Sequence, residues 1–534
     1  MEFLVSILAV LPSLCCVRLL FFITGLATVV TLHLSPAKAD GPAPPQERWP
    51  TCDVRSAVQK VSFVHISDMH ANYNLDVNGT SPMSRVRGYY ESVKKDNPFT
   101  VFTNSGDDYE KGSIAEELSR GRSTREVVQA MGYDVRTLGN HDFAWGIKEL
   151  LLFSNDPKAA VLSTNTRINR RIDSPLRDIP AGFTDFTVLT VGCVRIGFFG
   201  LTARPYGIDG GQHNGPVYPD LPALEMDFDF VGIAKRIVAR YRQEVDVLVL
   251  NSHMGLTDDI AVAEQTSGID LILGGHSHTT LEKSIRVKDT TIIHVGAQAE
   301  YIGRYDLFFD LASKTIIDSQ FQLVVNSPDK IKGNESMNTV VTNIMNRYQQ
   351  ELHEKVTEVK SDQSPHAMAL IAARAAVQKL RIDAAFVSVG SVWEKWRSGG
   401  LTRQDILDAF RVEREPVGTP GTSSLYLVEM TGASLLHVRT ILQDDAYWGP
   451  AEINPSSFYT VALQKPQALN QQQLFSRTIA IGLPRPVAEL WEVVVSFAGD
   501  LSDRNLAMDD AGADRWSENL VALLTGQKKE HPAL

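Results

Sequence analysis

Cysteine is scarce in this chain, with four residues among 534, and so few thiols cannot build a disulfide scaffold for a fold of this size. Basic runs are absent too: 52 Lys and Arg stand against 63 Asp and Glu, a formal net charge of −11. An acidic chain without a basic run has no electrostatic attraction to nucleic acid polymers. The 43% hydrophobic and 22% charged content excludes a largely disordered or fibrous chain.

The one long apolar stretch lies at the N-terminus. Arg18 is followed by the uncharged run Leu19–Leu32 and then by Ala37-Lys38-Ala39. This order of positive charge, apolar core and small residues predicts a secretory signal in residues 1–39, cut after Ala39. Met1 to Val17 is apolar as well, so an uncleaved membrane anchor is the alternative. Both interpretations place the rest of the chain outside the cytoplasm, in the periplasm or secreted.

Export bears on the four cysteines. Cys15 and Cys16 lie in the predicted signal, which leaves Cys52 and Cys193 in the mature chain. An oxidising compartment permits a disulfide between them, and two buried free thiols are the alternative.

The pattern of the remaining chain predicts an α/β protein. A proline-rich linker covers residues 40–58, and apolar strand candidates then alternate with amphipathic segments. Several candidates are apolar throughout, as expected for strands covered on both faces. The six strand candidates of this part are 61–66, 99–104, 194–201, 245–250, 270–275 and 290–295. We expect a first domain over 59–325, a linker helix over 326–358 whose helical stretch is Thr339–Glu358, a second domain over 359–510 and a tail over 511–534.

Polar clusters rich in His and Asp follow five of the first domain's strands. They are S-D-M-H (67–70), N-S-G-D-D (104–108), G-N-H-D (139–142), N-S-H-M-G (251–255) and G-G-H-S-H (274–278). Strand ends converge at one edge of an α/β sheet, where ligands bind. Carboxylate and imidazole suit Zn, Mn or Fe, so a metal site is predicted. Its candidate residues are Asp68, His70, Asp107, Asn140, His253, His276 and His278.

Three neighbouring residues are interpreted as structural. Asp108 follows Asp107 and is expected to point away from the site as a turn residue. His65 lies within a strand candidate and is expected to pack or to face solvent. His294 ends another strand candidate, and a structural role is favoured over a contact with a metal ligand.

The order and content of the five clusters resemble the calcineurin-like metallophosphoesterases, and within them the secreted 5′-nucleotidase family. The GGHSHT motif and the stretch GAQAEYIGRYDL (296–307) add to the resemblance, which spans about Val61 to Leu323 and continues weakly beyond. It implies a four-layer α-β-β-α sandwich with two metal ions, followed by a smaller α/β C-terminal substrate-binding domain.

The resemblance also implies a role for each residue. Asp68, His70, Asp107 and His278 would hold one metal ion, and Asp107 would bridge to a second ion held by Asn140, His253 and His276. A bridging carboxylate keeps two cations at ~3.5–4 Å, the spacing of two-metal hydrolases. His141, beside Asn140, matches the family histidine that stabilises or protonates the leaving oxygen.

Two departures from the family pattern affect this interpretation. The family places an aspartate three residues after its G-N-H histidine, and here that position is Ala144. His141 is therefore expected to lack the carboxylate that fixes its tautomer, and whether Asp142 can replace it stays open.

The second departure concerns the C-terminal domain. Its N-x-G-G-x-R loop corresponds to SVGSVW (388–393), with Trp393 in place of the arginine, and the register of Arg397 and Arg403 does not match. The family's P-F-G-N turn and G-G-D-x-F/Y element are missing as well. Trp393, Trp396, Tyr447 and Trp448 would then form either an aromatic platform for another ligand or core.

The sequence thus predicts an exported hydrolase of phosphate esters with two divalent metal ions, of the 5′-nucleotidase type. Its partner would be a small phosphate ester, a nucleotide by preference, with no nucleic acid polymer and a membrane contact only if the N-terminal segment stays uncleaved. Two alternatives remain: a phosphodiesterase or phosphatase for a non-nucleotide ester, and a metal-bound binding protein without turnover.

Overall fold

The computed structural model describes residues 49–509, except 54, 169–181, 204–223 and 413–422. Beyond these it describes the backbone of three short strands, β1 (Val17–Ile23), β2 (Leu26–Leu32) and β11 (Gly215–Pro216). The chain divides into two units, residues 1–43 and 44–534, and in the first β1 pairs antiparallel with β2. The predicted signal over 1–39, most of the linker and the tail over 511–534 otherwise lie outside the described residues. None of the helices in the described part of the chain has the length and apolar character that a membrane span requires.

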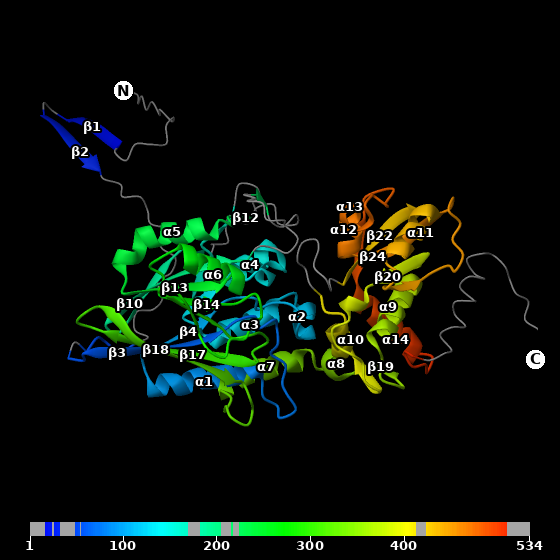
Figure 1. Ribbon diagram of the computed structural model, residues 1–534, viewed down its shortest axis with the longest axis horizontal. Helices are drawn as coiled ribbons and strands as arrows, with labels where there is room; N and C mark the ends of the chain where they lie inside the picture. The colour runs from blue at the N-terminus through cyan, green and yellow to red at the C-terminus, as the bar shows by residue number, and fades with distance from the viewer. Residues whose placement is uncertain are drawn as a thin grey trace, which may run out of the picture. The chain divides into compact units, whose positions relative to one another are not determined.

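Two β-sheets form the centre of the first domain (Figure 1). One sheet has seven strands, in the order β18 (Thr315–Val325), β17 (Tyr301–Asp310), β3 (Val58–Ile66), β4 (Thr100–Asn104), β5 (Val135–Thr137), β6 (Ala160–Leu162) and β8 (Phe183–Thr184). The other has six, in the order β15 (Ile285–Val287), β16 (Thr290–His294), β14 (Leu271–Gly274), β13 (Val247–His253), β10 (Val194–Thr202) and β9 (Thr187–Val191). The strands β3, β4 and β5 run parallel, as do β10, β13 and β14.

The alternation of side chains along these strands produces the layers. In β3, Val61 and Phe63 pack between the sheets, whereas Val64 and Ile66 belong to the core that faces the helices. Helix α1 (Pro82–Asp96) lies on β3 and β4, and its Tyr90 ring stacks on Phe102 at 4.4 Å. Helices α5 (Phe230–Tyr241) and α6 (Leu256–Gln265) cover the six-stranded sheet. The expected four-layer α-β-β-α sandwich is therefore confirmed (Figure 1).

Further elements complete this domain. They are α2 (Ile114–Ser119), α3 (Arg122–Met131), η1 (His141–Phe143), α4 (Gly146–Ser154), η3 (Arg242–Glu244), and a small sheet of β11, β12 (Leu224–Met226) and β7 (Thr166–Ile168). All six strand candidates of the sequence correspond to strands, namely β3, β4, β10, β13, β14 and β16.

The linker helix expected over Thr339–Glu358 begins earlier and ends earlier. It is α7 (Glu335–Arg347) followed by the short α8 (Gln349–His353). The prediction is wrong for its last residues, because β19 (Lys355–Val359) pairs antiparallel with β21 (Gly399–Thr402). That pairing joins segments about forty residues apart, which a local helical pattern does not reveal.

A second, smaller α/β domain follows, as expected. Its five-stranded sheet has the order β23 (Ala446–Trp448), β20 (Ala384–Val387), β24 (Phe458–Gln464), β22 (Ser424–Thr431) and β25 (Arg485–Glu489). Its helices are α9 (Pro365–Leu380), η4 (Val389–Ser391), α10 (Arg403–Ala409), α11 (Gly432–Ile441), α12 (Lys465–Leu469), α13 (Gln471–Phe475) and α14 (Leu490–Ser502). Ser364 caps α9 and is followed by Pro365 at the first helical position, where a missing N–H costs no hydrogen bond.

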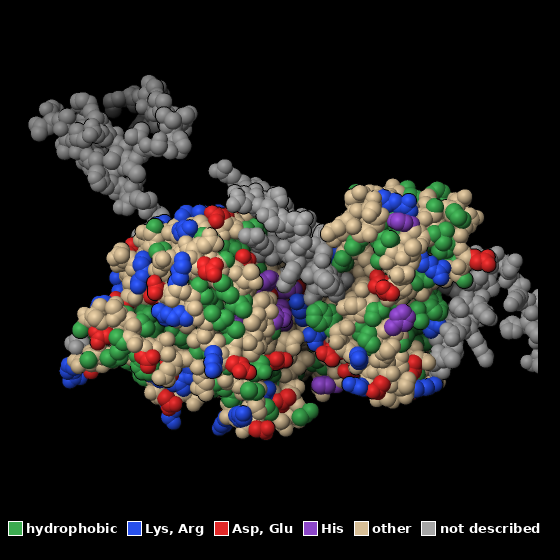
Figure 2. Space-filling model, viewed as in Figure 1, with side chains coloured by type: hydrophobic (Ala, Val, Ile, Leu, Met, Phe, Trp, Pro, Cys, Tyr) green, Lys and Arg blue, Asp and Glu red, His purple; other side chains and the backbone are tan. Residues whose placement is uncertain are grey.

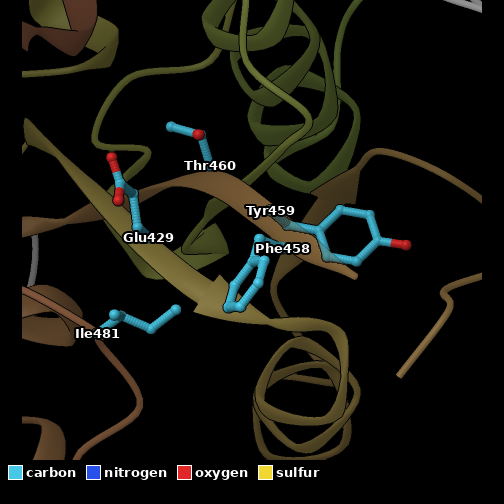
Figure 3. A pocket seen from close by; sticks show the side chains of 5 residues that line it. All are labelled: Glu429, Phe458, Tyr459, Thr460 and Ile481. Atoms are coloured by element: carbon cyan, nitrogen blue, oxygen red, sulfur yellow. The ribbon is translucent and has the colours of Figure 1, made fainter. Parts of the chain in front are cut away.

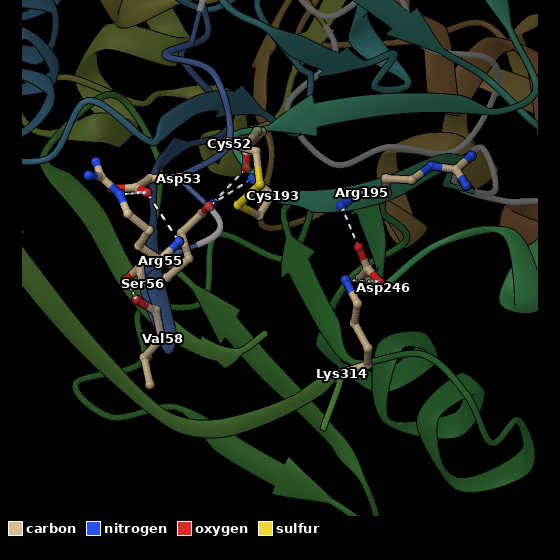
Figure 4. The surroundings of a disulfide bond; sticks show 11 residues. Cys52, Asp53, Arg55, Ser56, Val58, Cys193, Arg195, Asp246 and Lys314 are labelled. Atoms are coloured by element: carbon tan, nitrogen blue, oxygen red, sulfur yellow. Dashed lines mark hydrogen bonds and ion pairs between the residues drawn. A yellow bond between two sulfur atoms is a disulfide. The ribbon is translucent and has the colours of Figure 1, made fainter. Parts of the chain in front are cut away.

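A disulfide joins Cys52 and Cys193, which settles the alternative that the sequence left open (Figure 4). It ties the segment before β3, in one sheet, to the turn between β9 and β10, in the other. Gln59 of β3 supports the same place, because its side chain donates to Val191 O at 2.6 Å and accepts from the Cys193 N–H at 2.8 Å. The two sheets are therefore cross-linked at the end where β10 begins.

Candidate metal centre

All seven predicted ligands lie at the carboxyl ends of β3, β4, β5, β13 and β14: His253 is the last residue of β13, and the other six lie in the loops that follow the other four strands. Three groups of side chains have donor atoms that all lie within 4.8 Å of one another: Asp68, His70 and His278; His70, Asp107 and His141; and Asp107, His253 and His276. We call the seven residues Asp68, His70, Asp107, Asn140, His253, His276 and His278 the strand-end cluster. Convergence of these residues was the expectation from the sequence.

Backbone carbonyl groups orient two of the imidazole rings. His70 Nδ1 lies 3.2 Å from Tyr109 O, and His253 Nδ1 lies 2.6 Å from Ser105 O. A carbonyl oxygen only accepts, so each Nδ1 carries the proton. Each Nε2 is then left to face the cluster, which is how metal-binding histidines are usually held.

Asp107 lies at the centre of the cluster. Its carboxylate is 3.0 Å from His253 Nε2 and 3.9 Å from His70 Nε2, and it accepts the backbone N–H of His141 at 2.8 Å. Burial by itself raises the pKa of Asp107, but the charges of His253 and His141 outweigh burial and bring that pKa well below its usual range. Asp107 in turn raises the pKa of His253 to about 10, against the effect of burial.

The remaining members close the cluster from β3, β5 and β14. Asp68 accepts the His276 N–H at 3.0 Å and lies 3.6 Å from His278 Nε2, and burial raises its pKa. Asn140 Oδ1 lies 3.1 Å from His253 Nε2. Burial lowers the pKa of His276 to about 3, which keeps that ring neutral.

The cluster opens to solvent on one side. The His278 side chain is 43% exposed, whereas those of Asp68 and His70 are buried. Figure 2 shows histidine side chains gathered at the surface beside cationic ones. The cluster therefore meets solvent through His278.

Backbone strain marks the same loops. Asp68, His70, Asp107, His276 and His278 have φ angles between 49° and 73°, in the left-handed region. For a residue with a Cβ this conformation costs about 1–2 kcal/mol. Such strain concentrates at functional sites, where the surrounding structure holds it in place.

Asp142 clamps two of the loops together. Its carboxylate accepts the backbone N–H groups of Asp107 at 3.3 Å, Asp108 at 2.9 Å and Gly139 at 2.8 Å. Burial, together with the charges of Asp108 and Asp107, raises the pKa of Asp142 to about 8. Because its oxygens are engaged in this way, Asp142 fixes the ligand loops and does not serve His141.

His141 does have a carboxylate partner. Its Nδ1 lies 2.6 Å from Glu110 Oε2, and both side chains are buried. The expectation that Ala144 leaves His141 without such a partner is therefore wrong. Glu110 follows Asp107 by three residues, so it comes from a different loop than the one in which the family pattern placed the aspartate.

The three residues interpreted as structural lie apart from the cluster's donor groups. Asp108 is buried, accepts from Asn104 Nδ2 at 2.8 Å and lies 3.7 Å from Arg136. His65 is packed against Thr103, with Nδ1 3.0 Å from Oγ1. His294 Nε2 lies 2.7 Å from Asp259 Oδ2 in a buried pair.

The four aromatic residues of the second domain do not form one exposed platform. Trp396 is core and packs edge-on against Phe410. Tyr447 and Trp448 of β23 are covered by the guanidinium groups of Arg439 and Arg374. Trp393 is 44% exposed, and its ring lies 6.0 Å from Lys111 Nζ, one residue after Glu110. Arg397 is paired with Asp362 at 3.0 Å.

A separate hollow of about 250 Å³ lies in the second domain (Figure 3). It is lined by Glu429, Phe458, Tyr459, Thr460 and Ile481. One carboxylate among mostly apolar side chains offers no set of metal donors, so the hollow does not compete with the strand-end cluster as a metal site.

The strand-end cluster fits divalent metal ions. Four imidazoles, two carboxylates and one amide oxygen are donors that Zn, Mn and Fe accept. His70 Nε2 and His278 Nε2 lie 2.9 Å apart, a close approach of two nitrogens that a shared cation makes favourable.

Comparison with known proteins agrees with the fold. Residues 61–280 match the family of the calcineurin-like phosphoesterases. The chain is 28% identical over 280 residues to an apyrase of Tabanus yao, covering 47% of this chain and 48% of the relative. It is 25% identical over 254 residues to a 5′-nucleotidase of Mus musculus, covering 44% and 40%. The chain thus spans about half the length, or less, of these relatives.

A solved structure extends the likeness across both domains. The 5′-nucleotidase precursor from Thermus thermophilus superposes with a TM-score of 0.63 at 16% identity, covering 83% of this chain and 97% of that one. At this identity the likeness concerns the fold: a metallophosphoesterase domain followed by a C-terminal domain.

Proposed function

We propose that this protein is a hydrolase of phosphate esters with a dinuclear metal centre, and specifically a phosphomonoesterase of the 5′-nucleotidase type. The observation that carries the proposal is the place of Asp107, which belongs to two groups of metal-donor side chains at once. A carboxylate shared in this way suits a bridge between two cations.

The seven residues of the strand-end cluster divide into two ligand sets. Asp68, His70, Asp107 and His278 would hold one ion, and Asp107, Asn140, His253 and His276 the other. Bound ions of this kind supply Lewis acidity and a water whose pKa falls toward about 7. The chain's own contribution is to fix the ligands, through Asp142 and the carbonyls of Tyr109 and Ser105.

We propose two catalytic residues: His141, which lies outside the ligand sets, and its neighbour Asn140, which also belongs to the second set. The His141 ring lies edge-on to the His70 ring, with centroids 5.0 Å apart, and so borders the ligand sets. A protonated His141 can stabilise the leaving oxygen and give it a proton as the ester bond breaks. The buried partner Glu110 weakens the case for a binding protein without turnover, because a carboxylate–imidazole pair is useful for proton transfer.

Nucleoside 5′-monophosphates are the proposed substrates. The 5′-nucleotidase among the relatives supports this class. The main alternative is a non-nucleotide phosphate ester, favoured by Trp393, which stands where the family has an arginine. Its exposed ring could stack on any flat group, whether or not that group is a nucleobase. The neighbouring Lys111 ammonium could attract an anionic group.

We also propose a role for each domain of the chain and a cellular location for the protein. Residues 59–325 would form the catalytic domain, 326–358 the linker and 359–510 the substrate-binding domain. The N-terminal segment would export the protein to the periplasm or beyond. The disulfide between Cys52 and Cys193 supports an oxidising compartment.

Phosphate release from a panel of esters tests the proposal. The purified protein would be given 5′-nucleotides, cyclic nucleotides and aryl phosphates, each with Mn²⁺ and again with a chelator. Chelator-sensitive release from 5′-nucleotides is expected. Release from aryl esters alone would move the substrate to the non-nucleotide class, and no release with two metal ions bound would contradict the enzyme proposal.

A further inference from the structure

We propose that Glu110 is the positioning residue of His141. It would hold the imidazole in the orientation and tautomer needed to protonate the leaving group, in place of the aspartate that this chain lacks at Ala144. This inference rests on the proposed function, since it assigns a task within that same site. It depends on the geometry of three loops.

The contact between the two side chains is close and dry. His141 Nδ1 lies 2.6 Å from Glu110 Oε2, and the exposed fractions of the two side chains are 2% and 0%. In such surroundings a hydrogen bond between an imidazole and a carboxylate is stronger than it is in water. The ring is therefore fixed in one orientation.

The loop that carries His141 offers no carboxylate of its own to pair with the imidazole. Ala144 has none, and Asp142 holds the backbone N–H groups of Asp107, Asp108 and Gly139. The backbone of His141 is itself fixed, because its N–H donates to Asp107 Oδ1 at 2.8 Å. Glu110 thus bonds to the His141 ring, whose backbone is already held in place by the loop of Asp107.

Glu110 is held by its own loop. Its backbone has a φ of 67°, and its N–H donates to Glu116 Oε1 at 2.8 Å. The Glu116 carboxylate also accepts from Trp145 Nε1 at 2.8 Å and from Thr124 Oγ1 at 2.6 Å. Trp145 directly follows Ala144, so this network joins the Glu110 loop to the His141 loop.

The second domain holds the same loop from another side. Gln404 of α10 accepts the Ile114 N–H at 2.7 Å and donates to Gly112 O at 3.1 Å. A Cβ on Gly112 would come within 2.3 Å of His70 O, so the loop lies directly against the ligand loop after β3. Glu110 is therefore built into a rigid part of the fold, as positioning residues require.

The pair has a defined role in proton transfer. Glu110 accepts a hydrogen bond from the Nδ1–H of His141 and keeps its own negative charge, which stabilises the imidazolium. As the bond from phosphorus to the leaving oxygen breaks, the Nε2 proton passes to that oxygen and His141 becomes neutral. The need for this proton grows as the leaving group becomes more basic.

Dependence on the leaving group tests this role. We expect Glu110→Gln to keep its metal ions and KM, and to lower kcat on a nucleoside 5′-monophosphate about 10–100-fold. The loss on 4-nitrophenyl phosphate, whose leaving group needs no proton, should be several-fold smaller. In a His141→Ala background the same substitution should change kcat by less than about twofold, because its target is gone.

Glu149→Gln is the matched control, because Glu149 pairs with Tyr109 and Arg125 and does not contact His141. It should behave as the wild type does. Equal losses on both esters, or an undiminished loss in the His141→Ala background, would overturn the role of Glu110.

A spectroscopic readout keeps the inference separate from the proposed function. In ¹H NMR the Nδ1 proton of His141, identified by its loss in His141→Gln, should resonate far downfield in the wild type and in Glu149→Gln, and vanish in Glu110→Ala. Its absence from the wild type would overturn the inference even if esters are hydrolysed. Its presence in a protein without turnover would support the pair and refute the enzyme proposal.

Discussion

The side chains around Asp107 have two different roles. Some side chains point nitrogen and oxygen atoms into the strand-end cluster. Others accept hydrogen bonds from backbone N–H groups and so hold the loops in strained conformations. Asp142 and Glu116 are side chains that hold the loops in this way. Each is a buried carboxyl group whose oxygens accept hydrogen bonds from the main chain, so the loops depend on these two side chains for their shape.

Glu116 should make the stability of the fold depend on pH. Burial, then the charge of Glu117, raises its pKa from 4.5 to about 8. Between these values the unfolded chain has lost the proton that the folded chain still binds, so the free energy of unfolding falls as the pH rises from about 4.5 to 8. Glu116→Gln has no such proton, and its stability relative to the wild type should therefore be higher at pH 8 than at pH 5. Urea unfolding at both pH values checks this, and an unchanged difference between the two proteins would contradict it.

At the scale of elements, the strands could be predicted and the loops could not. The six apolar runs of the first domain predicted their strands because a strand covered on both faces is apolar throughout. The five polar clusters at the strand ends then predicted which side chains meet. The partner of His141 could not be predicted in this way, because Glu110 reaches it through a backbone with positive φ and a contact between two loops 31 residues apart. The presence of Glu110 three residues after Asp107 was the only local signal.

The same limit explains the end of the expected linker helix. Lys355–Val359 lies in β19 because β21 pairs with it, and that partner comes from beyond α9. Helix α10, which follows β21, begins with a capping box between Thr402 and Asp405. A capping box is typical of a helix start, but only the fold shows that Gln404 of α10 bonds to the loop that follows Glu110.

Helix α10 should therefore stabilise that loop through Gln404. Gln404→Ala removes its hydrogen bonds to Ile114 and Gly112, each worth about 0.5–1.5 kcal/mol. We expect a loss of about 1–2 kcal/mol in the free energy of unfolding and faster amide hydrogen exchange in residues 110–114. Gln472→Ala is the control, because Gln472 bonds to Ser476 at the surface, away from this loop. Unchanged exchange in Gln404→Ala would show that α10 does not hold the loop.

At the scale of the whole molecule, the site and the disulfide lie at opposite ends of the sheets. The strand-end cluster gathers at the carboxyl ends of the parallel strands, whereas Cys193 precedes β10 and Cys52 precedes β3. The bridge closes a loop with a sequence separation of 141 residues and so constrains about half of the first domain in the unfolded chain.

Removing this bridge should weaken the fold and leave the chemistry intact. For Cys52→Ser combined with Cys193→Ser we expect a loss of about 2–5 kcal/mol in the free energy of unfolding, with unchanged metal content and kcat at about 25 °C. Denaturant unfolding and metal analysis measure the two effects. If kcat falls while the protein remains folded, the bridge and the site are coupled in a way that the geometry does not indicate.

The central claim is that Asp107 bridges two metal ions on which turnover depends. Its most direct test is the metal content and the phosphate release of Asp107→Asn beside the wild type, with Asp318→Asn, an exposed residue of β18, as the control. The account predicts two divalent ions per chain and chelator-sensitive release in the wild type and the control, and the loss of both in Asp107→Asn. Asp107→Asn that keeps both ions and normal release would contradict it.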